Sequence, residues 1–397
     1  MIPNKNTFCI APYQHINITP KGDLKVCCVS KEEKKYKYYD TKNWHESDIL
    51  KSLRSNLEKG IKDPICNNCW KKEDTGYISQ RQIYNKHIGK ILENSWDKNF
   101  IKNKKLINAI ENVSLDNITS FDMELGNLCN LKCIMCNPGW SSQLLAEAKL
   151  NPELQKLDNY DLEANNYRWP EAEQFKDWCK KFLYKADYVQ ITGGEPFMNP
   201  YLLETLESIP AEQKRKCILQ FTTNLTKINN KILNIITKFK EAWLSVSVEG
   251  VGAVLEYARF GLKWHDLQKN LDTITKNKPN NLFLNLNHVV QSPTFVGITD
   301  LVNYFDNKKM KIEPLFLTYP TCFQLLSIKT IYKTQLLDKL KNYDGYNITY
   351  INSLKKFIQK NIKYDENLAK QCVYRLQAFD KVRKNDFTKI TPIDYFI

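Results

Sequence analysis

The sequence lacks any run of 18 apolar residues, although 42% of its 397 residues are hydrophobic. A helix needs about 20 such residues to cross a bilayer, so we expect no membrane-spanning segment. The first six residues, Met-Ile-Pro-Asn-Lys-Asn, also lack the apolar segment of a signal peptide. These two absences predict a cytoplasmic protein, in which the 12 cysteines serve metals or chemistry rather than disulfides.

Arginine is scarce as well. Only 7 of the 58 basic residues are arginine and the other 51 are lysine, in a chain of formal net charge +14. The lysines are spread along the chain, which favours a solvated surface, while a nucleic-acid partner stays open. Because the reading of base edges favours bidentate arginine, the scarcity argues against sequence-specific recognition of DNA.

Three cysteines, Cys129, Cys133 and Cys136, stand in a CxxxCxxC spacing. Apolar and polar residues alternate over 121–126, which predicts a strand that leads directly into this loop. Loops at the C-terminal ends of strands carry the chemistry of α/β barrels. A [4Fe–4S] cube usually takes four thiolates, so three would leave one iron free for a non-protein ligand. Structural zinc would usually need a second close cysteine pair, and none follows Cys136.

A second motif, Gly193-Gly194-Glu195-Pro196, follows the buried-looking strand 187–192. Two glycines let a ligand approach the backbone closely. The cysteine loop and this GGEP motif, in this order, resemble the two leading motifs of the radical SAM superfamily.

The resemblance implies an enzyme that binds S-adenosylmethionine at the open iron of a [4Fe–4S] cluster. It would cleave this cofactor reductively to a 5′-deoxyadenosyl radical, which abstracts hydrogen from a substrate. The substrate stays open between a peptide, a small metabolite and a sugar. An electron donor such as a flavodoxin or ferredoxin is implied as a partner.

The resemblance also implies a set of cofactor-binding residues, namely Met135, Gly193, Gly194, Glu195, Ser247, Glu249 and Arg259. Met135 takes the place of an aromatic residue beside the adenine, and the GGE residues would meet the methionine amino group. Ser247 and Glu249 can both accept hydrogen bonds from the ribose diol. Arg259 would pair with the cofactor carboxylate, a task that suits a bidentate guanidinium.

A second set of cysteines lies in the first 90 residues, where a turn at Pro20–Gly22 predicts a hairpin. Cys9, Cys27 or Cys28, Cys66 and Cys69 are four potential ligands. They suit tetrahedral zinc or a second, fully ligated [4Fe–4S] cluster.

The order of these cysteines resembles the auxiliary-cluster signature of SPASM and twitch radical SAM proteins. In much of that family the auxiliary segment follows the barrel, whereas here it leads. A twitch subgroup begins with a Phe-Cys-x-x-Pro-aromatic segment, a double cysteine and a CxxC, as this chain does. The resemblance favours iron–sulfur over zinc, with Cys27 as the ligand of the doublet and Cys28 as the alternative.

Strands that alternate with helices predict parallel βα units. Six strands are expected, at 121–126, 187–192, 217–223, 242–248, 282–290 and 313–318. They predict an α/β fold, a partial (β/α)6 TIM-like barrel with a cysteine-rich N-terminal auxiliary segment and C-terminal helices. The expected divisions are 1–90 for the auxiliary segment, 91–120 for a connector, 121–320 for the barrel and 321–397 for a helical region.

A different class of function stays open beside this one. With zinc at both cysteine sets, the basic chain would be a metal-stapled nucleic-acid-binding protein. A radical SAM enzyme that acts on RNA combines the two interpretations.

Overall fold

The computed structural model describes residues 4–31, 34–74, 78–89, 103–157, 162, 168–227 and 230–397. Two compact units are present, and each is described by itself. The first unit comprises residues 1–126, 167–220 and 234–242, and the second comprises residues 127–166, 221–233 and 243–397. Most of the first half of the expected connector 91–120 lies outside the described residues.

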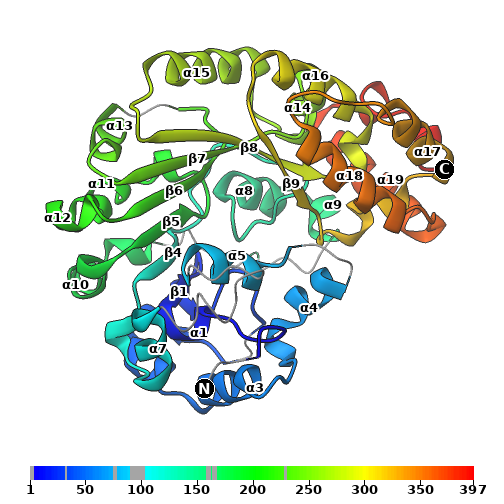
Figure 1. Ribbon diagram of the computed structural model, residues 1–397. Helices are drawn as coiled ribbons and strands as arrows, with labels where there is room; N and C mark the ends of the chain where they lie inside the picture. Colours follow the sequence, from blue (N-terminus) through cyan, green and yellow to red (C-terminus); the bar gives the residue numbers. More distant parts are fainter. Residues whose placement is uncertain are drawn as a thin grey trace. The chain divides into compact units, whose positions relative to one another are not determined.

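The strands are arranged in the order β3-β2-β1-β4-β5-β6-β7-β8-β9, so the sheet is open, with β3 and β9 at its edges. Figure 1 labels β1 and β4 to β9 of this sheet. Their bounds are β1 His15–Ile18, β2 Asp23–Lys25, β3 Tyr36–Lys37, β4 Ser120–Glu124, β5 Tyr188–Thr192, β6 Ile218–Thr223, β7 Glu241–Ser247, β8 Leu282–Val290 and β9 Ile312–Phe316. All six strands expected for the barrel are present as β4 to β9, and the predicted open α/β fold is confirmed.

In the first unit, β1 and β2 form the expected antiparallel hairpin. β1 also pairs in parallel with β4, and β4 pairs in parallel with β5, so the N-terminal hairpin continues the sheet of the barrel strands. A hairpin is a local signal in sequence, whereas the pairing of β1 with a strand about 100 residues later depends on tertiary contacts.

One face of these three strands is apolar. Its side chains are fully or almost fully buried and comprise Ile16, Ile18, Phe121, Met123, Val189 and Ile191. Helix α10 (Glu173–Phe182) packs here, with the Trp178 ring edge-on to Phe121 at a centroid distance of 5.7 Å. Successive residues of a strand face opposite sides, so the polar residues between these apolar ones share the other face.

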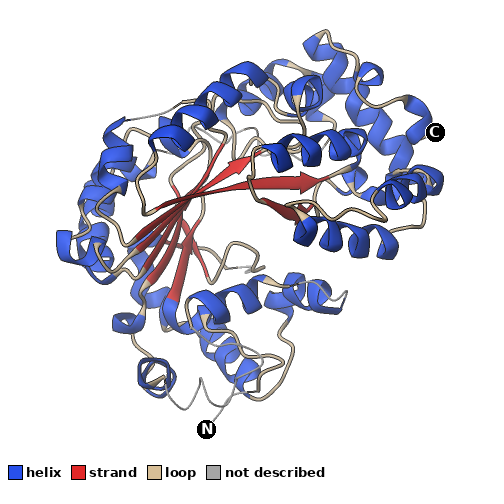
Figure 2. Cartoon of the chain, turned by 45° about the horizontal axis from the view of Figure 1, so that its top comes forward, coloured by secondary structure: helices blue, strands red, loops and turns tan. Residues whose placement is uncertain are grey.

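The second unit contains the parallel pair β8 and β9, in register from Leu286 opposite Ile312 to Val290 opposite Phe316. Helices and strands alternate along the chain from β7 to β9. Figure 2 distinguishes the helices and strands of the chain by colour. The longer helices of the second unit are α8 Ser142–Leu150, α14 Gly252–Ala258, α15 Trp264–Asn277, α16 Ile298–Asn307, α17 Thr330–Lys339, α18 Ile348–Lys360 and α19 Glu366–Arg383. The last three are the helices expected beyond residue 321.

Further helices belong to the first unit. They are α1 Ala11–Gln14, α2 Thr41–His45, α3 Asp48–Glu58, α4 Asn67–Asp74, α5 Gln80–His87, α7 Lys104–Glu111, α11 Leu202–Glu207 and α12 Ala211–Lys214. Within the described part of the chain, no helix combines the length and the apolar character that crossing a bilayer requires.

Candidate functional site

The loop that follows β4 carries Cys129, Cys133 and Cys136. Cys129 and Cys133 are each 8% exposed, and Cys136 is half-buried. Burial raises the pKa of the Cys136 thiol above its ordinary value, and the thiols of Cys133 and Cys129 raise it further. The three sulfur atoms therefore lie within electrostatic reach of one another. They would ionise readily only with a cation or metal cluster among them.

The main chain of this loop is anchored to the end of α14. The Lys132 amide donates to the Phe260 carbonyl oxygen at 2.9 Å, and the Ile134 amide donates to the Ala258 carbonyl oxygen at 2.9 Å. These two hydrogen bonds flank Cys133. The loop is thus held in place by the protein itself, as a preorganised ligand set requires.

Arg259, directly after α14, lies beside this loop. Its side chain is 11% exposed and forms a two-pronged ion pair with Glu249, through Nε to Oε2 and through Nη2 to Oε1 at 2.8 Å. Its Nη1 lies 3.7 Å from Cys133 Sγ. Burial opposes the charge of Arg259, but the Glu249 carboxylate outweighs burial and raises the pKa of the guanidinium. A permanent positive charge therefore faces the cysteine loop.

The sequence predicted that Arg259 binds the cofactor carboxylate and that Glu249 binds the ribose. In the structure the two side chains form an ion pair with each other. Ser247 is the last residue of β7, one residue before the predicted strand end at Val248, and is buried. Met135 is half-buried between Cys133 and Cys136. All of these residues belong to the second unit, together with the three cysteines.

Two further groups near the loop were missed or left open by the sequence. Asn224, at the end of β6, places its Nδ2 4.0 Å from Cys129 Sγ. Arg383, at the end of α19, binds Glu147 through Nη2 at 2.7 Å, and Lys132 binds the same carboxylate at 2.8 Å. Arg383 belongs to no motif in the sequence, and it lies about 250 residues beyond the loop, so the sequence alone did not connect the two.

The GGEP motif lies in the first unit, at the end of β5. Gly193 has φ +105°, and a Cβ there would lie 2.8 Å from the Gly126 carbonyl oxygen. The Gly194 amide donates to that same oxygen at 3.2 Å. The Glu195 carboxylate is buried and accepts a hydrogen bond from the Phe197 amide at 3.2 Å. The close approach of the main chain at Gly193 to that at Gly126 thus explains why residue 193 is glycine, since an L side chain would be strained and crowded there.

The N-terminal cysteines form a second group, in the first unit. Burial raises the pKa of Cys9 and of Cys27 to about 12 each, and the Cys69 thiol contributes to both shifts. Burial also raises the pKa of Cys66, with further contributions from Cys9, Cys27 and Cys69. Four thiols from three separate segments of the chain therefore influence one another.

Cys28, the alternative ligand, has different neighbours. After burial of its thiol, the charge of Asp122 is the largest cause that raises its pKa, and the Tyr84 hydroxyl oxygen lies 3.9 Å from its sulfur. The residue as a whole is nonetheless exposed. The two cysteines of the doublet thus lie in different surroundings, with Cys27 among the other three thiols.

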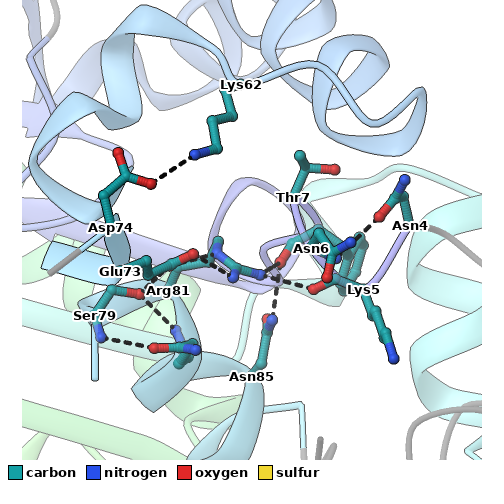
Figure 3. A network of polar contacts seen from close by, with 12 residues as sticks. Asn4, Lys5, Asn6, Thr7, Lys62, Glu73, Asp74, Ser79, Arg81 and Asn85 are labelled. Carbon is teal, nitrogen blue, oxygen red and sulfur yellow. Dashed lines mark hydrogen bonds and ion pairs between the residues drawn. The ribbon is translucent and has the colours of Figure 1, made fainter. Parts of the chain in front are cut away.

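A polar network holds the backbone at Cys9 (Figure 3). Arg81 binds Glu73 through Nε at 2.9 Å and Nη2 at 2.8 Å, and its Nη1 donates to the Phe8 carbonyl oxygen at 2.8 Å. Asn85 Nδ2 donates to the same oxygen at 2.9 Å. Across the described residues, no three His, Cys, Asp or Glu side chains converge as one metal ion would require. A [4Fe–4S] cube distributes its thiolates over four irons rather than one ion.

The Radical SAM superfamily model matches residues 123–291. No curated protein matches the sequence. Similar solved structures include native anSMEcpe with bound AdoMet, at 20% identity and a TM-score of 0.39 over 56% of this chain and 58% of that chain. Streptococcus suis SuiB bound to S-adenosylmethionine follows at 16% identity and 0.39, over 67% of this chain and 61% of that chain.

SuiB bound to its precursor peptide SuiA is similar over 95% of this chain and 73% of that chain, at 13% identity and a TM-score of 0.34. The chain spans less than two thirds of the length of anSMEcpe. TM-scores below 0.5 do not indicate which reaction a protein catalyses. The family match does not depend on them, and it covers all three cysteines of the loop and the GGEP motif. Residues 123–291 are therefore a domain of the radical SAM superfamily.

Proposed function

We propose that this protein is a radical SAM enzyme with two iron–sulfur clusters. The first cluster would be held by Cys129, Cys133 and Cys136 and would bind S-adenosylmethionine. The observation that carries the proposal is the grouping of three buried or half-buried thiols on one anchored loop, with the Arg259 guanidinium beside them.

The residues present fit such a cluster. The pKa of Cys133 and of Cys136 is raised mainly by burial, so each thiolate needs a positive partner close by. Iron supplies that charge, and Arg259 and Arg383 already lower the pKa of Cys133. Three thiolates leave one iron open to an exogenous ligand.

Each neighbouring side chain has a positioning or binding task in this proposal. Arg259 binds the cofactor carboxylate, and Glu249 fixes the orientation of the guanidinium through two hydrogen bonds. Ser247 remains the candidate for the ribose hydroxyls. Gly193 and Gly194 let the chain turn tightly after β5, and Met135 packs beside the adenine. When bound, the cluster supplies the electron that cleaves S-adenosylmethionine to methionine and a 5′-deoxyadenosyl radical.

The second cluster would be held by Cys9, Cys27, Cys66 and Cys69. Their mutual influence on pKa supports a shared metal site, and four thiols would complete the coordination of a cube. Zinc is the alternative occupant, since a tetrahedral site also takes four thiolates. Arg81 and Asn85 would keep Cys9 in place for either metal.

The substrate is proposed to be a peptide, a small metabolite or a sugar, and the electron donor a flavodoxin or ferredoxin in the cytoplasm. The hydrogen atom would be taken from this substrate, which makes the protein an oxidoreductase or modifying enzyme.

Iron, acid-labile sulfide and zinc per chain, measured after anaerobic purification and reconstitution, test the proposal. We expect about eight irons, of which about four are lost in the Cys129/Cys133/Cys136 triple alanine variant. We also expect 5′-deoxyadenosine when the wild-type protein receives S-adenosylmethionine and a reductant. About four irons and one zinc would make the N-terminal site a structural zinc site. Zinc in both sites and no iron would overturn the proposal and favour nucleic-acid binding, with strong dependence on salt.

A further inference from the structure

The first unit has a polar sheet face that the proposed cofactor chemistry does not use. In parallel sheets both faces are usually apolar, and barrel interiors are filled by branched apolar side chains. Here the strand registers place polar residues side by side on one face, namely His15, Asn17, Ser120, Asp122, Glu124, Tyr188, Gln190 and Thr192. A buried polar face of this size requires partners for its donors and acceptors.

Two acceptors on this face have no partner. Asn17 and Asp122 are opposite each other in the β1–β4 register and are 0% and 1% exposed. Neither Asn17 Oδ1 nor Asp122 Oδ1 has a hydrogen-bond partner among the described residues. Asn17 Nδ2 lies 3.4 Å from Glu124 Oε1 and 3.5 Å from the Asp122 carbonyl oxygen, and these two acceptors fix the orientation of the amide.

The carboxyl groups of Asp122 and Glu124 lie close enough to affect each other electrostatically. Burial raises the pKa of Asp122 to about 8, and the negative charge of Glu124 raises it further, against smaller opposite effects of Asn17, Thr192 and Lys25. Lys25 is the only cation among these causes, and its Nζ also lies 3.4 Å from the Cys28 carbonyl oxygen. Asp122 therefore bears a full negative charge at neutral pH only when a cation stands beside it.

Two neighbouring side chains on this face, Tyr188 and His15, carry no positive charge. The Tyr188 hydroxyl lies 2.9 Å from Gln190 Oε1 and 2.7 Å from Gln220 Oε1, so it is engaged with neutral amides. His15 lies on the same face, but burial lowers its pKa to about 3, which keeps the ring neutral. The thiol of Cys28, an exposed residue, lies near Asp122.

We propose that Asn17, Asp122 and Glu124 form a binding site for an organic cation, an alkylammonium or guanidinium group carried by the substrate. Such a group brings positive charge and several N–H donors to Asn17 Oδ1 and Asp122 Oδ1, which have no donor among the described residues. The inference rests on the proposed function, because it assigns this site to the substrate of that enzyme. A divalent metal ion is a poorer match, since Mg²⁺ and Ca²⁺ need about six or more oxygen ligands and the Asn17 amide directs a donor at Glu124.

Binding to the reconstituted, full-length protein in the presence of S-adenosylmethionine tests the inference. The probes are N-acetyl-lysine methylamide, n-pentylammonium and the neutral N-acetyl-norleucine methylamide, measured by ligand-observed NMR or calorimetry. We expect the blocked lysine to bind about tenfold or more tightly than its norleucine analogue, because a charged donor strengthens each hydrogen bond. Tighter binding of n-pentylammonium than of blocked lysine would identify a free amine as the source of the cation. Equal binding of blocked lysine and norleucine would overturn the inference.

Variants locate the site. Asp122→Asn and, separately, Glu124→Gln should each reduce the affinity for blocked lysine about tenfold and leave the affinity for norleucine unchanged. Asp116→Asn is the matched control, since Asp116 is an exposed carboxylate of the same unit. Unchanged lysine binding in both variants would overturn the proposal, as would competition by Mg²⁺ or Ca²⁺ at equal concentration.

The two failures are distinguishable. If the wild-type protein holds iron and forms 5′-deoxyadenosine but does not prefer cations, the cation site fails alone. If it holds no iron, the proposed function fails, whatever the probes show. The wild-type comparison of lysine with norleucine needs no variant, so a variant that misfolds does not remove the test.

Discussion

The two cysteine sets differ in number and in their surroundings. The loop set offers three thiols from eight consecutive residues, beside the Arg259 guanidinium. The N-terminal set offers four thiols from three separate segments, and Cys66 has Asp63 as a further negative neighbour. Three thiols leave room for an exogenous ligand, whereas four complete a cube.

The two cysteine sets are also held in place by different contacts. The loop is held by hydrogen bonds to the residues after α14 and by charge from Arg259 and Arg383. The N-terminal set is held at Cys9 by the Arg81 network, whose guanidinium is committed to Glu73 and to a carbonyl oxygen. Both sets thus have a nearby arginine that is paired with a glutamate, but Arg259 directs its Nη1 at a cysteine sulfur, whereas Arg81 directs its Nη1 at a main-chain carbonyl oxygen.

The replacement Cys133→Ala should have the largest effect. It removes the central thiolate of the loop set, so we expect a loss of about four irons and a fall in 5′-deoxyadenosine formation of about 100-fold or more. Cys179→Ala is the control, because Cys179 is a buried thiol of α10 far from either set in sequence. Unchanged 5′-deoxyadenosine formation in Cys133→Ala would contradict the assignment of this loop.

Replacing a thiol of the N-terminal set should have a smaller effect on cofactor cleavage. For Cys66→Ala we expect a loss of about four irons, with 5′-deoxyadenosine formation still measurable. Cys28→Ala is the matched comparison, since Cys28 faces Asp122 and Tyr84 instead of the other thiols. Iron analysis of both variants checks this. Loss of iron on Cys28→Ala, with none on Cys27→Ala, would reverse the choice within the doublet.

Spacing and periodicity were sufficient to predict the six barrel strands, because alternation and the motif order are local features. The choice between Cys27 and Cys28 was not accessible in this way. Two adjacent residues after a short strand point to different neighbours, and only the packed chain shows which neighbours these are. Arg383 was inaccessible for a similar reason, since its approach to Glu147 depends on the placement of α19.

The polar face of β4 was partly visible in the sequence. Ser120, Asp122 and Glu124 alternate with apolar residues, a pattern usually typical of a strand with one side in water. Asp122 and Ser120 are instead buried, on the face opposite the one that packs against α10. Polar alternation in a strand of a parallel sheet is therefore a signal for an interior polar site.

The replacement Arg259→Lys tests whether the arginine beside the cysteine loop acts through its charge alone or also through its two-pronged geometry. Lysine keeps the charge but cannot form the two-pronged contact with Glu249 or a carboxylate. We expect the Kd for S-adenosylmethionine to rise about tenfold, with full iron content. Arg215→Lys, at an exposed arginine, serves as the control. If the affinity for S-adenosylmethionine stays the same, Arg259 acts on the loop alone.

The smallest expected effect is on the pH dependence of stability, and it concerns one buried histidine in each unit. Burial lowers the pKa of His15 and of His288 to about 3, so both are neutral when folded. The unfolded chain protonates each histidine as the pH falls below about 6.5, while the folded protein does not. The stabilising contribution is therefore fully present above pH 6.5 and is lost as the pH falls, by up to about 1.4 kcal/mol per pH unit for each histidine.

Unfolding by urea between pH 7 and pH 5, monitored separately for each unit by a local probe, measures this slope. His15→Gln should flatten the pH dependence of the first unit, and His288→Gln that of the second, because glutamine takes up no proton in either state. A slope that stays steep in the double variant would mean that carboxylates, rather than these histidines, set the acid sensitivity. A slope that flattens in both units with either single variant would show that the units unfold together, and the two cysteine sets would then share one stability.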